Sequence, residues 1–185
     1  MVEIIKPGLI LLLITVTAAF MLGGVYEITK EPIRLQQESD KNAAMSKLIP
    51  EASEFSQIEL IVNDNGITEI FSGYNNGVCA GYIISSETQG YGGVIGILTA
   101  FDMNGSIIDL EILKSSETPG LGENVKNASL TGQFINKFSR ITVTKSSPNE
   151  NEIQAVTSAT ISSNAVTSAV NASIDYFNAY ILGGN

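Results

Sequence analysis

Histidine is absent from this sequence of 185 residues, and Cys79 is its only cysteine. Without an imidazole, the chain lacks the most common metal ligand and the base of Ser-His or Cys-His nucleophile pairs. A single thiol cannot form an internal disulfide, a Cys-x-x-Cys redox pair or a complete ligand set for an iron–sulfur cluster. The sequence therefore predicts no catalytic residue and no metal site, and any electron transfer would need an organic cofactor.

Basic residues are also scarce, since 10 Lys and Arg stand against 19 Asp and Glu and the formal net charge is −9. Phosphate backbones and anionic membrane surfaces repel a domain this acidic. We therefore expect no nucleic-acid partner. The apolar content is nevertheless ample for one packed domain with appendages.

Charge is missing altogether from residues 8–25, which read GLILLLITVTAAFMLGGV, and the apolar character extends over 7–28. This run is long enough to cross a bilayer as one helix. The small residues at 17–19 loosely resemble the cleavage site of a secretory signal peptide, but the apolar run continues past them. The sequence therefore predicts that residues 1–28 contain an uncleaved, single-pass anchor. Lysines flank the run on both sides, so the positive-inside rule sets no orientation.

Residues 29–52 are polar with spaced apolar positions, and they predict a helical stalk that is interrupted near Pro32. Beyond the stalk, residues 53–185 predict a single α+β domain. Short runs rich in Ile, Val, Leu, Phe and Tyr alternate there with Asn-Gly turns, a pattern typical of an antiparallel sheet. The predicted strands are 58–62, 67–74, 78–85, 94–102 and 107–113, and the predicted turns are 65–66, 76–77 and 104–105.

Helices are expected to pack against this sheet. The first covers 123–138, and a short strand at 141–144 and a polar loop at 145–152 follow it. The N-terminus of the last helix is expected at residues 160–163, because apolar residues recur beyond it at three- and four-residue intervals. The expected core residues of the first helix are Val125, Leu130, Phe134 and Phe138. Those of the last helix are Ile161, Ala165, Val166, Ala169, Val170, Ile174, Phe177 and Ile181.

Hydroxyl residues gather at the start of the last helix, in the segment QAVTSATISS at 154–163. This segment resembles the flavinylation motif of the G subunit of Rnf ion-translocating complexes and of its relative, the C subunit of the sodium-pumping NADH:quinone reductase. The family pattern is Asp-x-x-Ser/Thr-Gly-Ala-Thr/Ser, and a flavin transferase joins its last hydroxyl to the phosphate of FMN. The resemblance implies that Thr160 carries a covalent FMN through a phosphoester.

Three positions of the segment match this pattern, namely Thr157, Ala159 and Thr160, whereas Gln154 and Ser158 stand where the family usually has Asp and Gly. Apart from the family, a helix beginning at this point offers free backbone N–H groups and a positive dipole end to an anion. The alternative is that these hydroxyl residues are ordinary helix caps, since Ser and Thr are favoured wherever a helix starts.

A second segment, ETPGLG at 117–122, resembles a loop of the same family and matches it at every position. Glycines without Cβ let a backbone lie against a flat ring, and proline stiffens the approach. The pair Gln133-Phe134 also matches the family, and the glycine-rich run at 90–93 resembles a turn that could form another wall of the flavin pocket. The loop residues that the resemblance assigns to the flavin are Glu117, Thr118, Pro119, Gly120, Leu121 and Gly122. On its own, this loop would be read as a turn between a strand and a helix, which Pro-Gly and Gly-x-Gly mark in any protein.

The resemblance covers nearly the whole chain, so it implies an overall role. The chain would be a membrane-anchored electron carrier, without catalytic activity of its own, in a translocase that couples ferredoxin and NAD electron transfer to ion transport. Its partners would be the other Rnf subunits and the flavin transferase, and residues 53–185 would lie outside the cytoplasm at the plasma membrane. The alternatives are a stand-alone extracytoplasmic FMN carrier and a pilin-like structural protein, which also has a Glu near the start of an apolar helix, as at Glu3.

Overall fold

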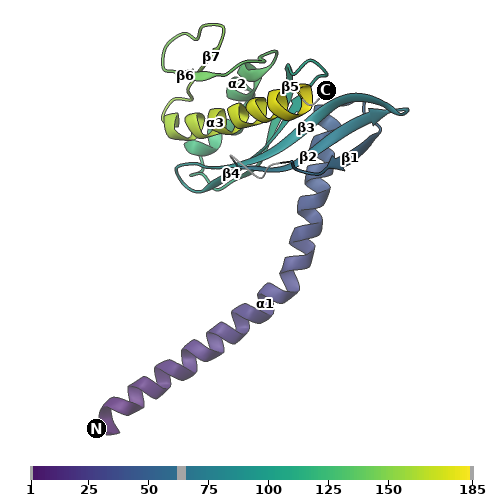
Figure 1. The fold of residues 1–185 in the computed structure, drawn as a ribbon. Coiled ribbons are helices and arrows are strands. Elements are labelled where there is room, and N and C mark those ends of the chain that lie inside the picture. Colours follow the sequence, from purple (N-terminus) through teal and green to yellow (C-terminus); the bar gives the residue numbers. More distant parts are fainter. Residues whose placement is uncertain (1, 62–65, 184–185) are drawn as a thin grey trace. The chain divides into compact units, whose positions relative to one another are not determined.

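The computed structural model describes residues 2–61 and 66–183, and the chain divides into two compact units at residues 42 and 43. Helix α1 (Val2–Leu48) accounts for the first unit and supplies its last residues to the second (Figure 1). The predicted interruption near Pro32 is wrong, because α1 passes through this residue without ending. A proline removes one backbone hydrogen bond, which bends a long helix more readily than it ends one.

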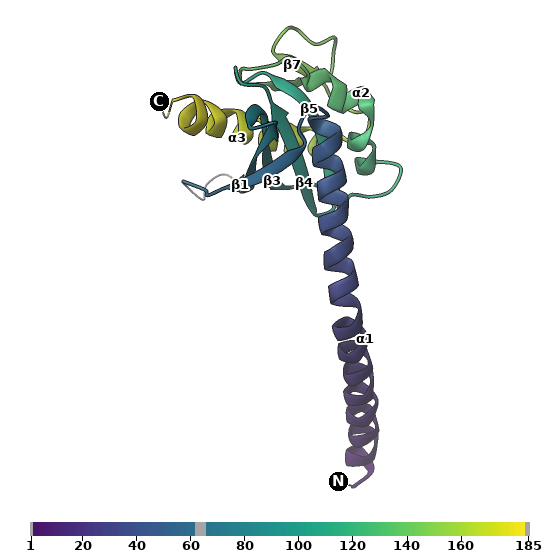
Figure 2. The ribbon, with the colours of Figure 1, turned by 90° about the vertical axis from the view of Figure 1, so that its right-hand side faces the viewer.

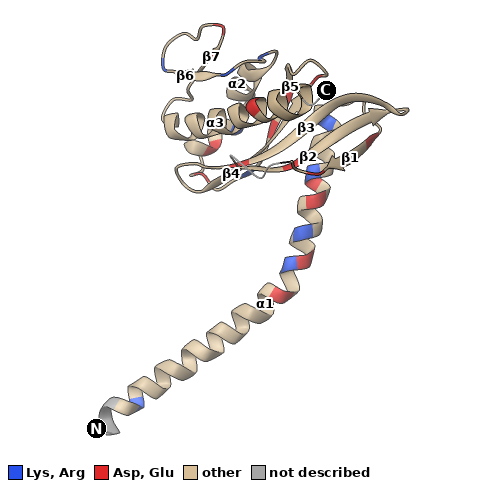
Figure 3. Ribbon diagram, viewed as in Figure 1, with Lys and Arg blue, Asp and Glu red and all other residues tan. Residues whose placement is uncertain are grey.

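The first unit has one stretch that is long and apolar enough to cross a membrane, judged by length and composition, and none of that stretch is buried within the protein. Figure 3 shows its ribbon nearly free of charge until the acidic and basic residues that follow it. There the side chain of Arg34 pairs with Glu31 and Glu38 at 3.2 and 3.0 Å. Pairs at this spacing stabilise an exposed helix.

The second unit contains the predicted antiparallel sheet, whose strands follow one another in chain order. They are β1 (Glu54–Ile58), β2 (Ile67–Asn75), β3 (Val78–Gln89), β4 (Val94–Phe101) and β5 (Ile107–Ser115). The turn between β2 and β3 has two left-handed residues, Asn76 and Gly77, as a tight hairpin requires. Four strands lie where the sequence predicts them, but the first ends at Ile58 instead of beginning there. Residue 62 of this predicted strand and residue 65 of the predicted turn at 65–66 lie outside the described residues.

Neighbouring side chains of each strand point to opposite faces of the sheet, so the second unit has two cores. One face packs against helix α3 (Thr160–Tyr176) and the segment before it, with Phe101, Phe134 and Phe177 fully buried. The other face packs against the last turn of α1 through Met45 and Leu48. Figure 2 shows the sheet between these two layers. The architecture is therefore the predicted α+β class.

The predicted helix at 123–138 is wrong as a single element. The structure has three short pieces instead, η1 (Gly122–Lys126), α2 (Ala128–Thr131) and η2 (Gly132–Phe134), because Asn127 takes an extended conformation with ψ 145°. Val125, Leu130 and Phe134 are buried as predicted, whereas Phe138 lies beyond the last piece and is exposed.

Two short parallel strands, β6 (Thr142–Thr144) and β7 (Glu152–Gln154), precede the last helix. The sequence predicts the first of them and misses the second, which carries only one buried side chain, Ile153. Helix α3 begins at Thr160 as predicted and passes into a π-helical segment, η3 (Phe177–Leu182). Its core face agrees with the prediction except at Ile161, which is 58% exposed.

Candidate functional site

A cavity of about 300 Å³ lies where the loop at 117–122 meets the start of α3. The two segments are far apart in sequence, and the fold brings them together. The residues that line the cavity are Tyr91, Glu117, Thr118, Leu121, Gly122, Ser158, Ala159, Thr160, Ile161 and Ser162. Seven of the residues predicted from sequence are among them, whereas Thr157, Pro119 and Gly120 are exposed nearby and do not line it.

The N-terminus of α3 opens on this cavity without a side-chain cap. Ala159 occupies the cap position, and the described residues form no side-chain cap hydrogen bond at this end of the helix. Ser163 is engaged elsewhere, because its Oγ donates to the Ala159 carbonyl at 2.9 Å and accepts from the Val156 N–H at 3.0 Å. The helix-cap alternative for these hydroxyl residues therefore fails. The half-buried Thr160 stands beside free N–H groups and the positive end of the helix dipole, a setting that favours a phosphate.

Ser158 takes a left-handed backbone conformation, with φ 64°. This explains the physical preference for glycine at this point of the motif, since a residue with a Cβ is strained there by about 1–2 kcal/mol. The turn reverses the chain between Val156 and the helix, where the Ala159 N–H donates to the Val156 carbonyl at 3.0 Å. Ser158 is therefore tolerated, at a cost in stability.

Replacing Ser158 by glycine should raise the free energy of unfolding by about 0.5–1 kcal/mol, because relief of the left-handed strain exceeds the added chain entropy. Thermal unfolding of the full chain in detergent measures the change. Thr157→Gly is the matched control, since Thr157 has no positive φ and its variant should be less stable than the wild type. A Ser158→Gly variant that unfolds at a lower temperature than the wild type would contradict this account.

Gln133 holds the strand that leads into the motif. The Gln154 N–H donates to Gln133 Oε1 at 2.6 Å, and Gln133 Nε2 donates to the Gln154 carbonyl at 3.3 Å. Both bonds involve only the backbone of Gln154, whose side chain is exposed. The neighbouring Phe134 is fully buried. The Gln133-Phe134 pair thus joins β7 to the core, and the substitution at Gln154 leaves this connection intact.

Three exposed apolar side chains surround the mouth of the cavity. Tyr91 is 73% exposed, Ile161 is 58% exposed and Leu121 is 50% exposed. Such side chains can contact the faces and edge of a flat aromatic ring. Sequence reasoning misses Tyr91 as an individual residue and places Ile161 in the core. The sequence signals that could have identified these two residues are the glycine-rich run around Tyr91 and the position of Ile161 directly after Thr160.

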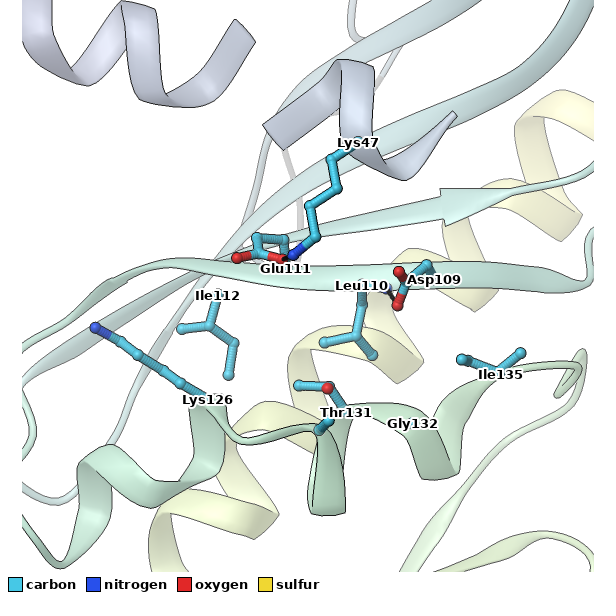
Figure 4. A pocket seen from close by; sticks show the side chains of 10 residues that line it. Lys47, Asp109, Leu110, Glu111, Ile112, Lys126, Thr131, Gly132 and Ile135 are labelled. Carbon is cyan, nitrogen blue, oxygen red and sulfur yellow. Dashed lines mark hydrogen bonds and ion pairs between the residues drawn. The ribbon is translucent and has the colours of Figure 1, made fainter. Parts of the chain in front are cut away.

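A second cavity, of about 340 Å³, lies between β5 and the pieces η1 and α2 (Figure 4). Both lysines that line it pair with carboxylates of the same chain, because Lys47 Nζ donates to Glu111 Oε2 at 2.7 Å and the Lys126 amine lies 3.5 Å from Glu123. The hydrogen bond to Glu111 raises the pKa of Lys47. None of the predicted site residues lines this cavity. The cavity at the start of α3 is therefore the better candidate for the functional site.

The chain is similar to known proteins over most of its length. The family model of the FMN-binding domain matches residues 90–175, which include both segments of the site. The chain is 33% identical over 159 residues to the G subunit of the proton-translocating ferredoxin:NAD(+) oxidoreductase complex of Clostridium ljungdahlii, covering 85% of this chain and 83% of that protein. It is 34% identical over 190 residues to the G subunit of the Na(+)-translocating ferredoxin:NAD(+) oxidoreductase complex of Acetobacterium woodii, covering 94% of this chain and 91% of that protein.

A solved structure shows the same fold. The crystal structure of the C subunit of the Na(+)-translocating NADH-quinone reductase from Parabacteroides distasonis superimposes with a TM-score of 0.58 and 16% identity, over 78% of this chain and 93% of that one. The similarity to the Acetobacterium woodii protein extends over 94% of this chain. This chain therefore belongs to the family of G subunits of Rnf-type, ion-translocating ferredoxin:NAD(+) oxidoreductase complexes.

Proposed function

We propose that this chain carries one FMN, bound through a phosphoester to Thr160 Oγ1, and relays electrons as the membrane-anchored G subunit of an Rnf-type complex. Such complexes couple ferredoxin and NAD electron transfer to ion transport, as the names of the two relatives state. The chain has no independent catalytic activity in this role. Its partners are the other members of the complex and, during maturation, a flavin transferase.

The position of Thr160 is the observation that carries this proposal. Its hydroxyl belongs to the first residue of a helix of 17 residues whose N-terminus has no side-chain cap, and it lines the cavity between the two family motifs. The helix end favours a phosphate electrostatically, and the apolar rim favours a flat ring beside it. The residues present therefore fit an FMN whose phosphate is at Thr160.

FMN, when bound, supplies the electron-transfer chemistry that the side chains of this protein lack. The chain holds and orients it. The N–H groups of the first turn of α3 would face the phosphate, and the loop at 117–122 would limit the space open to the ring. Tyr91 and Ile161 would shield the ring from water at the mouth of the cavity.

Attachment forms one bond, between Thr160 Oγ1 and the phosphorus of FMN. The hydroxyl proton goes to a base, and the leaving group of an activated flavin donor departs from the phosphorus. The intact mass of protein produced with the transferase should therefore exceed that of protein produced without it by one FMN less one water. Equal masses in the two preparations would contradict covalent attachment.

For the topology, we propose that residues 1–28 form a cytoplasmic N-terminus and the transmembrane anchor. Residues 29–52 form the stalk, and residues 53–185 form the FMN-binding domain outside the cytoplasm. The exposure of every described side chain in the apolar stretch supports a lipid-facing helix, because these groups have no protein partner within the described residues. With this anchor, the protein is located in the cell's plasma membrane.

The mature protein should retain its N-terminus, since the apolar stretch continues beyond the small residues at 17–19. N-terminal sequencing of the protein purified from membranes measures this directly. A mature N-terminus near Phe20 would overturn the anchor.

Protease added outside intact cells should digest residues 53–185, and protection of the domain in that assay would overturn the topology.

A further inference from the structure

Glu117 is the one charged side chain among the buried residues that the structure describes, with 7% of its surface exposed. It lines the same cavity as Thr160. Charged side chains are rarely buried unless another group compensates them, because their removal from water carries a large cost in free energy. The contacts of this carboxylate therefore indicate what keeps it in place.

Two donors from separate segments bind the two oxygens of this carboxylate. Ser162 Oγ donates to Oε2 at 2.9 Å, and the Gly92 N–H donates to Oε1 at 3.2 Å. Within residues 2–61 and 66–183, no ion pair joins Glu117 to a lysine or arginine. Its negative charge is thus solvated by neutral dipoles and is not cancelled by a cation.

The backbone is closed around this carboxylate. A Cβ added at Gly90 would lie 2.0 Å from Oε1, and one added at Gly122 would lie 2.1 Å from Oε2. Both glycines therefore contact the carboxylate directly, and the side chain has little freedom to turn toward water. A fixed negative charge in a poorly solvated site acts more strongly on its neighbours than the same charge in water.

We propose that Glu117 tunes the cofactor, acting as a fixed negative charge that lowers the reduction potential of the flavin held on Thr160. This inference rests on the proposed function. Reduction adds electrons to the flavin, so a nearby negative charge makes the reduced form less favourable. No bond to the protein forms or breaks in this step, and in a titration the electrons come from added dithionite.

Glu117→Gln tests the proposal, because it removes the charge and keeps the shape. The amide oxygen can still accept from the Gly92 N–H, and the amide nitrogen can donate to Ser162 Oγ. The midpoint potential of the covalent flavin, measured by spectroelectrochemical titration of the full chain in detergent, should become more positive. Glu123→Gln is the matched control. It makes the same change in net charge at a half-exposed carboxylate in the adjoining segment and should leave the potential unchanged.

Ser162→Ala should shift the midpoint potential of the flavin in the opposite direction. It keeps the carboxylate and removes one donor that screens it, so the potential should become more negative. If Glu117 had a purely structural role, the midpoint potentials of both variants would shift in the same direction. The unfolding temperature of Glu117→Gln would then fall without opposite changes in potential. Should Glu117→Gln fail to fold, an unchanged or raised potential in Ser162→Ala still overturns the proposal.

The two proposals fail in different ways. Absence of covalent flavin from the wild-type protein made with its transferase overturns the attachment to Thr160, and the tuning role falls with it. Covalent flavin with the same potential in the wild type and in Glu117→Gln overturns the tuning role alone.

Discussion

Thr160→Ala and Thr160→Val should both abolish the covalent flavin in protein co-produced with the transferase. The attachment needs a side-chain hydroxyl, and both substitutions remove it while keeping a residue compatible with the start of α3. Fluorescence of the flavin in a denaturing gel should fall to background, since only covalent flavin survives denaturation. The fold should remain, because Thr160 is only partly buried and Ala159, not Thr160, occupies the cap position of the helix.

Two neighbouring variants sharpen this result. Thr160→Ser keeps the hydroxyl and should retain some attachment. Thr157→Ala removes another hydroxyl of the same segment, one that is exposed and outside the cavity lining, and should retain at least partial fluorescence. Fluorescence that persists in Thr160→Ala would show that a different residue accepts the flavin.

Gly122→Val is expected to be the most destabilising change in the site, at about 3 kcal/mol, through overpacking and loss of buried hydrogen bonds. Its Cβ would lie 2.1 Å from Glu117 Oε2 and 2.9 Å from Ser162 Oγ, so the buried carboxylate would have to move away from both of its donors. Urea unfolding of the full chain in detergent measures the loss. Covalent attachment should also decrease, because the first turn of α3 is tied to the loop through this contact.

Gly120→Val separates the two effects that glycine can have in this loop. Gly120 has φ +76°, and nothing lies within 4 Å of an added Cβ. The variant should therefore lose only about 1–2 kcal/mol from the left-handed backbone. The covalent flavin should persist, because Gly120 does not line the cavity. Equal losses of stability in Gly120→Val and Gly122→Val would contradict this difference between the two glycines.

Local patterns predicted those parts of the fold that depend on local interactions. The Asn76-Gly77 turn forms because both residues tolerate positive φ, and its flanking strands follow from it. The helix predicted at 123–138 fails because Asn127 is extended, yet Val125 and Phe134 are still buried. Burial follows apolar character here more closely than it follows helical period, since a side chain can reach the core from a short turn as well as from a helix.

The site was predictable as two motifs and not as a cavity. The resemblance singled out Thr160 and the loop at 117–122, and the fold places them together. The contact of Glu117 with Ser162 joins residues 45 positions apart, and no local pattern encodes such a pair. Ile161 is exposed although its neighbours Ser162 and Ser163 are buried, so the first turn of α3 directs this one side chain away from the core. These features depend on tertiary packing, which periodicity alone does not describe.

Peptide mass mapping of the chain co-produced with its flavin transferase tests the central claim most directly. Digestion should yield one flavin-bearing peptide that contains residue 160, with fragmentation placing the mass of FMN less one water on Thr160. The same peptide from protein made without the transferase should be unmodified. A flavin-bearing peptide that lacks residue 160, or fragmentation that places the flavin on Thr157 or Ser158, would contradict the account.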